Sequence, residues 1–132
     1  MKQFGLSAKE RIKSKNEFDA VYSSGQILYS FSNKLKAVIL IQSETEEAVL
    51  KTAFAVSRKS GNAVWRNRVK RLLRESFRKN KHELKSIVEL KKIKLLVVLS
   101  PNAINQSNSS KIFLGDLLSD VIDLLSKIKE KL

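Results

Sequence analysis

The sequence has no cysteine among its 132 residues. Disulfide bonds and thiolate metal sites are therefore excluded, which fits a reducing cytoplasm. Histidine occurs once, at His82, and a single histidine without partners predicts a surface side chain and no metal site. Long hydrophobic runs are also missing, because apolar runs such as Leu95–Leu99 are too short to span a bilayer. The N-terminal residues Met1–Ser14 lack the apolar core of a signal peptide.

Acidic residues are half as frequent as basic ones. The chain has 13 Asp and Glu against 26 Lys and Arg, which gives a formal net charge of +13. Such a balance on a small domain is typical of nucleic-acid binding, with binding to a membrane surface as the main competitor. The hydrophobic fraction of 42% is enough for one core. With no internal repeat, residues 1–132 are expected to form a single domain.

The basic residues concentrate in the run from Ser57 to Arg78. Asn62 is a good N-cap, and a helix is expected from about Ala63 to Asn80, with an end that could lie as far as Leu84. At helical spacing, Val69, Leu72, Leu73 and Phe77 form an apolar stripe. The opposite face carries Asn67, Arg71, Arg74 and Arg78, flanked by Arg68 and Lys70, with Arg66 nearer the apolar edge. Guanidinium groups on one rigid face suit phosphate oxygens, so this face predicts a polyanion partner.

A short first helix is expected before the sheet, after an irregular arm over residues 1–13. It should run from Lys15 to about Ser23, capped by Ser14 and ended by Gly25. Phe18, Val21 and Tyr22 share one of its faces. Spacing alone favours core packing for this aromatic pair.

The remaining pattern predicts strands and one long helix. Gln26–Tyr29 suggests an edge strand, and Leu35–Ile41 a strand covered on both faces. An acidic turn over residues 42–47 should make a hairpin with Val49–Ser57, whose small residues Ala53 and Ala55 leave one face open to approach. A strand over Lys94–Ser100 should end at Pro101, before a loop over Asn102–Ser110.

An amphipathic helix is expected from about Ser110 to Lys129. Asp116, Asp120 and Asp123 lie off its apolar stripe and predict a solvated acidic face. The whole pattern indicates an α+β fold, a compact two-layer sandwich of order α-β-β-β-α-β-α with part of the sheet open.

The basic run closely resembles the signature of the bacterial ribonuclease P protein subunit. Arg66-Asn67-Arg68 follows Gly61-Asn62-Ala63-Val64 and precedes Val69-Lys70-Arg71-Leu72-Leu73-Arg74-Glu75-Ser76-Phe77. Arg11-Ile12-Lys13, Glu17-Phe18, Val21-Tyr22 and Gly25 resemble the first helix of the same family. The two blocks cover about a third of the chain in the right order.

The resemblance implies a fold with a left-handed βαβ crossover, similar to a domain of ribosomal proteins, and an accessory role in an endoribonuclease. The catalytic RNA would remove the 5′ leader of precursor tRNA with Mg²⁺ that the RNA holds, and the protein would carry no catalytic or metal-binding residue. The positions expected to contact the catalytic RNA are Arg58, Lys59, Arg66, Asn67, Arg68, Lys70, Arg71 and Arg74. Those expected to contact the leader are Phe18, Tyr22, Arg11 and Lys15. The free protein is expected to be a cytoplasmic monomer that binds the RNA 1:1, without a membrane partner.

Other function classes remain open at this point. A ribosomal or ribosome-assembly RNA-binding protein would have the same charge and a related fold. A protein-only nuclease would need clustered carboxylates or a partnered histidine, and the acidic residues here are dispersed. Membrane-surface binding is disfavoured because the basic helix has an apolar face of only four residues, which the core is expected to cover.

Overall fold

The computed structural model describes residues 10–43 and 47–132. In chain order the elements are α1 (Lys15–Ser24), β1 (Gln26–Tyr29), β2 (Leu35–Gln42), β3 (Val49–Phe54), the 3₁₀ turn η2 (Arg58–Ser60), α2 (Ala63–Asn80), α3 (His82–Lys91), β4 (Lys94–Pro101) and α4 (Leu114–Lys131). The expected α+β order is confirmed, with α3 as an addition. Most of the expected N-terminal arm lies outside the described residues, as do positions 44–46 of the expected acidic turn.

The four strands form one mixed sheet in the order β1-β2-β4-β3. β4 pairs antiparallel with β2 and parallel with β3. The predicted hairpin between β2 and β3 is therefore wrong, because β4 lies between them, and the hairpin partner of β2 is β1. β2 and β4 have buried side chains on both faces and occupy the centre, whereas β3 is an edge strand. The parallel pair requires a crossover, which α2 and α3 provide.

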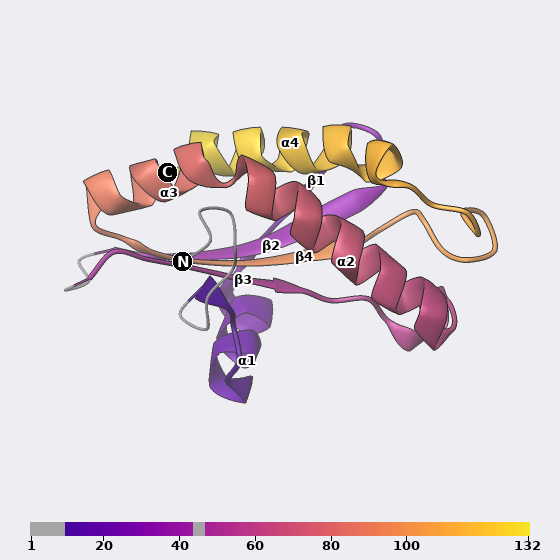
Figure 1. Cartoon of the computed structure of the whole chain (residues 1–132). Coiled ribbons are helices and arrows are strands. Elements are labelled where there is room, and N and C mark those ends of the chain that lie inside the picture. Colours follow the sequence, from indigo (N-terminus) through magenta and orange to yellow (C-terminus); the bar gives the residue numbers. More distant parts are fainter. Residues whose placement is uncertain (1–9, 44–46) are drawn as a thin grey trace.

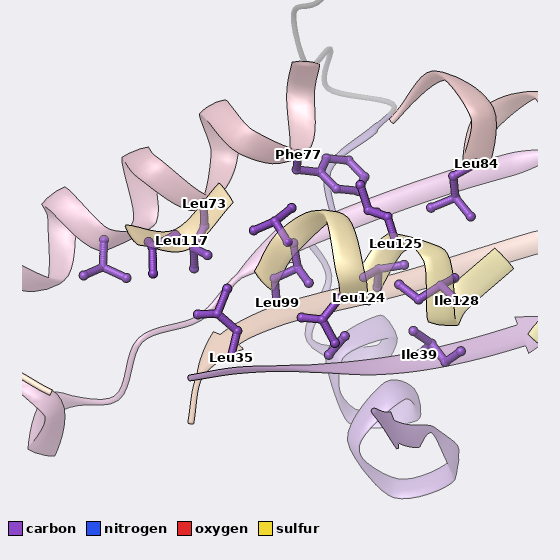
Figure 2. Close-up of a cluster of buried hydrophobic side chains, with 14 of the residues drawn as sticks. Leu35, Ile39, Leu73, Phe77, Leu84, Leu99, Leu117, Leu124, Leu125 and Ile128 are labelled. Atoms are coloured by element: carbon purple, nitrogen blue, oxygen red, sulfur yellow. The ribbon is translucent and has the colours of Figure 1, made fainter. Parts of the chain in front are cut away.

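Helices cover the two faces of the sheet unequally. Figure 1 shows α2, α3 and α4 together on one face, and α1 alone on the other. The larger core lies under the three helices, where Leu73 and Phe77 of α2 meet Leu117, Leu124 and Ile128 of α4 (Figure 2). Full burial of each such side chain contributes about 1.5–3 kcal/mol. This core fixes α2 on the sheet along the predicted apolar stripe.

The face under α1 has a smaller core. Val21 packs there with Ile12 and with Val38, Leu96 and Val98 of the central strands, and Phe18 packs against them. Gly25 ends α1 as predicted, although its backbone is extended, with φ −80°. The reason for glycine is a close approach, because a Cβ at residue 25 would lie 2.2 Å from the carbonyl oxygen of Val21 and 2.8 Å from that of Ile39.

The sequence left the end of the basic helix open between Asn80 and Leu84, and the structure has two helices in this region. α2 ends at Asn80, and α3 begins at His82 after a single residue, Lys81. Lys81 is only 2% exposed, and its Nζ lies 2.5 Å from Oε2 of Glu10. This pair links the N-terminal segment to the junction of the two helices. His82 is exposed, as predicted.

The predicted solvated acidic face of the C-terminal helix is wrong at Asp120. Its side chain is 2% exposed and accepts a hydrogen bond from Ser30 Oγ at 2.5 Å, and another from Ser32. Asp123 accepts a hydrogen bond from the amide of Phe31 at 2.9 Å. These carboxylates hold the turn between β1 and β2 against α4. The helix itself starts at Leu114, four residues later than predicted.

Candidate nucleic-acid interface

The basic helix α2 is fixed at its start and along its inner face. Asn62 caps it as predicted, with Oδ1 accepting from the amide of Trp65 at 2.9 Å. Trp65 is itself buried at 3% exposure, and its Nε1 donates to the carbonyl oxygen of Ser109 at 2.9 Å. The apolar stripe predicted from the helical spacing did not include this tryptophan. The anchored inner face leaves the opposite side of α2 outward.

Three site residues form the outward face of α2, which we call the docking face: Asn67, Arg71 and Arg74. All three are exposed, and none of them makes an ion pair with a described residue. Arg78, one turn further on, hydrogen-bonds Glu75 together with Lys79, and the hydrogen bond from Arg78 lowers the pKa of Glu75. On this face, the guanidinium groups that form no ion pair with a described residue, those of Arg71 and Arg74, therefore lie within the two turns before Arg78.

Arg66, Arg68 and Lys70 lie on the flanks of α2 and differ in their surroundings. Arg68 donates from Nε to the carbonyl oxygen of Ile112 at 2.7 Å, and its guanidinium carbon lies 5.6 Å from the centre of the Phe113 ring. Arg66 is half-buried, and its Nε has no hydrogen-bond partner among the described residues. Lys70 lies on the flank opposite Arg68, where it lines a pocket together with residues of strand β3.

A pocket opens between α2, α1 and the edge of β3 to which Arg11 is bridged. It brings together residues that the resemblance assigns to two different RNA partners. Arg74 lies over the Phe54 ring, with the guanidinium carbon 5.9 Å from the ring centre. The lining residues are Arg11, Ile12, Phe18, Thr52, Ala53, Phe54, Lys70 and Arg74.

A second pocket lies just beyond the end of β3, on the sheet face that α1 leaves open. Tyr22 borders it at 55% exposure, so the aromatic pair of α1 is only partly core: Phe18 packs and Tyr22 projects. The lining residues are Tyr22, Lys36, Ala55, Val56, Ser57, Ser100 and Pro101. We call the two pockets together the sheet groove. β3 ends at Phe54, three residues before the predicted end at Ser57. Ala53 and Ala55 nevertheless line the sheet groove, in agreement with the prediction that these small residues leave room on one face.

Charges around the sheet groove are arranged unevenly. Glu17 forms ion pairs with Lys51 at 3.1 Å and with Lys94 at 3.3 Å. Burial raises the pKa of Glu17, but the hydrogen bonds and charges of the two lysines outweigh burial and hold the pKa below its ordinary value. Lys36 has no such counter-charge among the residues that the structure describes. Lys36 was not among the predicted site residues, although it interrupts an otherwise apolar strand, which is a signal visible in the sequence.

The other predicted site residues lie at the borders of these surfaces. Arg58 and Lys59 are exposed in η2, between β3 and α2. Lys15 is exposed at the first turn of α1, and Arg11 bridges to Thr52 at the edge of the sheet. Within residues 10–43 and 47–132, no group of three metal-ligating side chains occurs, and no helix has the length and hydrophobicity needed to cross a membrane.

Fold and surface together define a basic α+β protein of the RNA-binding class, with a cationic helix beside a partly open sheet. Comparison with known families is more specific. The model of the ribonuclease P family, described as "Ribonuclease P", matches residues 6–127. The chain belongs to this family.

Individual relatives agree with this assignment. The ribonuclease P protein component of Geotalea uraniireducens is 42% identical over 81 residues, which cover 61% of this chain and 67% of the relative. That of Listeria innocua is 35% identical over 98 residues, covering 74% of this chain and 76% of the relative. Among solved structures, the RNase P protein from Thermotoga maritima has a TM-score of 0.66 at 21% identity, covering 89% of this chain and 96% of that one. These findings support a subunit in tRNA 5′ processing and do not favour the ribosomal alternative.

Proposed function

We propose that this chain is the accessory protein subunit of a ribonuclease P ribonucleoprotein, in which the RNA subunit cleaves the 5′ leader from precursor tRNA. The docking face of α2 binds the catalytic RNA, and the sheet groove holds the single-stranded leader. The observation that carries the proposal is their adjacency. Lys70 and Arg74 of the basic helix line the same pocket as Phe18 of α1. One rigid unit can therefore hold the catalytic RNA and its substrate side by side.

The chemistry of the docking face suits a folded RNA. Asn67, Arg71 and Arg74 are held on a helix whose inner side is buried, so their Cα positions are fixed before binding. Arginine forks bind phosphate oxygens with two parallel hydrogen bonds. Each phosphate that is neutralised releases condensed counterions, which makes the affinity depend on salt. This face supplies position and charge and needs no base-specific contact.

The chemistry of the sheet groove suits a single strand of variable sequence. Aromatic faces stack on any base, and cations follow the backbone. Phe18 and Tyr22 provide the rings, and Arg11, Lys15 and Lys36 lie nearby. Small side chains at Ala53, Ala55 and Ser57 let the strand approach the sheet. The groove would raise the affinity for precursor tRNA over mature tRNA, because only the precursor has a leader.

The protein itself supplies no catalytic group in this proposal. The RNA subunit holds the Mg²⁺ ions and positions the attacking water, and the protein strengthens metal binding by stabilising, through its phosphate contacts, the RNA fold that holds the ions. The cytoplasm is the expected location. The free chain is expected to be a monomer, because a charge of +13 opposes self-association, and to bind the RNA 1:1.

Reconstitution tests the proposal. The chain is added to a bacterial ribonuclease P RNA, and cleavage of precursor tRNA is measured over a magnesium series. The chain should lower the magnesium concentration needed, and the protein alone should be inert. The matched variant Arg71→Ala should shift the requirement back, whereas Leu90→Ala, on the exposed side of α3, should not. An unchanged magnesium requirement with the wild-type chain would refute the proposal, and co-purification of a ribosomal RNA instead would favour the runner-up.

A further inference from the structure

The open face of the sheet extends beyond the sheet groove toward strand β1. In the register of the β1–β2 pair, Tyr29 lies directly opposite Lys36. Directly opposed residues project from the same face of a sheet, with Cβ atoms about 5 Å apart. Lys36 lines the pocket that Tyr22 borders. Tyr22, Lys36 and Tyr29 therefore follow one another across the same face.

Tyr29 is available for contact. Its side chain is 46% exposed although it belongs to a strand in the sheet, and Phe31, two residues further on, is 65% exposed. The turn after Tyr29 is firmly held, since Lys127 donates to the carbonyl oxygen of Tyr29 at 2.7 Å and Asp123 accepts from the amide of Phe31. These are exposed aromatic rings on a fixed backbone, which is the arrangement that base stacking requires.

The charged residues differ between the two directions in which an RNA strand could leave the sheet groove. Toward the start of α1, Glu17 neutralises Lys51 and Lys94 and places a carboxylate beside any approaching phosphate. Toward β1, Lys36 is the next cation and forms no ion pair with a described residue. A polyanion that has passed Tyr22 is therefore favoured along Lys36, whereas Lys51 and Lys94 are already neutralised by Glu17.

We propose that an extended single-stranded RNA segment continues from Tyr22 over Lys36 to Tyr29, which makes the exposed face of β1 a distal binding surface for the leader. The inference rests on the proposed function and adds a direction and an end point to it. It commits to RNA as the occupant because the surface continues the sheet groove and combines a free cation with exposed rings.

The test measures equilibrium binding of precursor tRNAs whose leaders are lengthened by single nucleotides to the reconstituted holoenzyme. Affinity should rise in two stages, first as the leader reaches Phe18 and Tyr22 and again as it reaches Lys36 and Tyr29. Tyr29→Ala should remove the second rise, weakening the binding of long leaders about fivefold or more and leaving short leaders unaffected. Tyr29→Phe should restore it, since the ring is retained. Lys36→Gln should lower the salt slope for long leaders by about 0.7.

Controls separate this inference from the proposed function. Leu90→Ala removes an exposed apolar side chain elsewhere and should bind every leader as the wild type does. If Tyr29→Ala and Lys36→Gln bind long leaders normally while Phe18→Ala weakens precursor binding, the distal path is wrong and the sheet groove stands. If Phe18→Ala and Tyr22→Ala also bind normally, the leader role of the groove itself fails. An equal loss for leaderless tRNA would show that Tyr29 acts on something other than the leader and would overturn the path.

Discussion

Variants of Arg68 can distinguish a structural role of the Arg-Asn-Arg motif from the effect of its positive charge. The segment from Gln106 to Phe113 crosses the first turns of α2, and Arg68 holds it there through Ile112 and Phe113. Trp65 adds a hydrogen bond to Ser109. Arg68→Lys keeps the positive charge but loses the planar group that makes both contacts. We therefore expect Arg68→Lys to destabilise the protein while preserving the salt slope of RNA binding.

The loss of stability expected for the Arg68 variants follows from its two contacts, the hydrogen bond to Ile112 and the cation–π contact with Phe113. A hydrogen bond from a charged donor contributes about 1.5–3 kcal/mol, and a cation–π contact at an exposed ring about 0.5–1 kcal/mol. Because Arg68 is only half-buried, the lower ends apply, and Arg68→Ala should cost about 2 kcal/mol. For a domain of this size the melting temperature would fall by about 8 °C. Arg68→Lys should lose about half as much, since an ammonium group can still reach a carbonyl oxygen through water.

Urea denaturation of the free protein measures this cost, with Arg71 as the matched control. Arg71 lies on the same helix, is exposed and has no partner among the described residues. Arg71→Ala should change stability by less than about 0.5 kcal/mol but lower the salt slope of RNA binding by about 0.9. Hydrogen exchange over residues 106–113 should accelerate in the Arg68 variants only. Equal stability of Arg68→Ala and Arg71→Ala would show that the contacts of Arg68 do not hold the segment.

Two further predictions concern buried or paired carboxylates. Glu17→Gln should lower the free energy of unfolding by up to about 1 kcal/mol at neutral pH. Because the folded-state pKa of Glu17 is lowered, this difference in stability is present above the ordinary glutamate pKa. It should vanish as the pH falls through the folded-state pKa. A pH series of denaturation midpoints checks it, and a difference that persists in strong acid would contradict the ion-pair assignment. Asp120→Ala should cost about 2–4 kcal/mol, because the Ser30 and Ser32 hydroxyls lose a buried charged acceptor. Calorimetry checks it against Glu130→Ala, an exposed residue of the same helix; similar melting temperatures would mean that Asp120 is not a structural acceptor.

Local signals in the sequence were sufficient for the helices that carry the site. Asn62 and Ser14 each cap the helix that was expected to follow them, because a cap depends only on the next three residues. The apolar stripe of α2 is likewise a local property of helical spacing. The docking face could therefore be located before the fold was known.

The wrong predictions, such as the β2–β3 hairpin, concerned contacts between residues that are far apart in the sequence. The sequence favoured a β2–β3 hairpin because neighbouring strands often pair, yet β4, which begins 40 residues after the end of β3, takes the place between them. Asp120 lies off the apolar stripe of α4, but helical spacing does not show that the β1–β2 turn covers it. Lys36 and Tyr29 belong to one surface only because β1 and β2 pair in that register.

The open sheet face has a simple geometric origin. α2 and α4 have 18 residues each, or about 27 Å, which matches the length of about 26 Å of the eight-residue strands β2 and β4. α1 has ten residues, or about 15 Å, and cannot cover the same strands from the other side. Beyond its reach the strands carry Lys36 and Ser100, which tolerate water, instead of the valines and leucine that α1 buries. An apolar pair at positions 36 and 100 would need a longer first helix to cover it, and that helix would occupy the surface where we place the RNA.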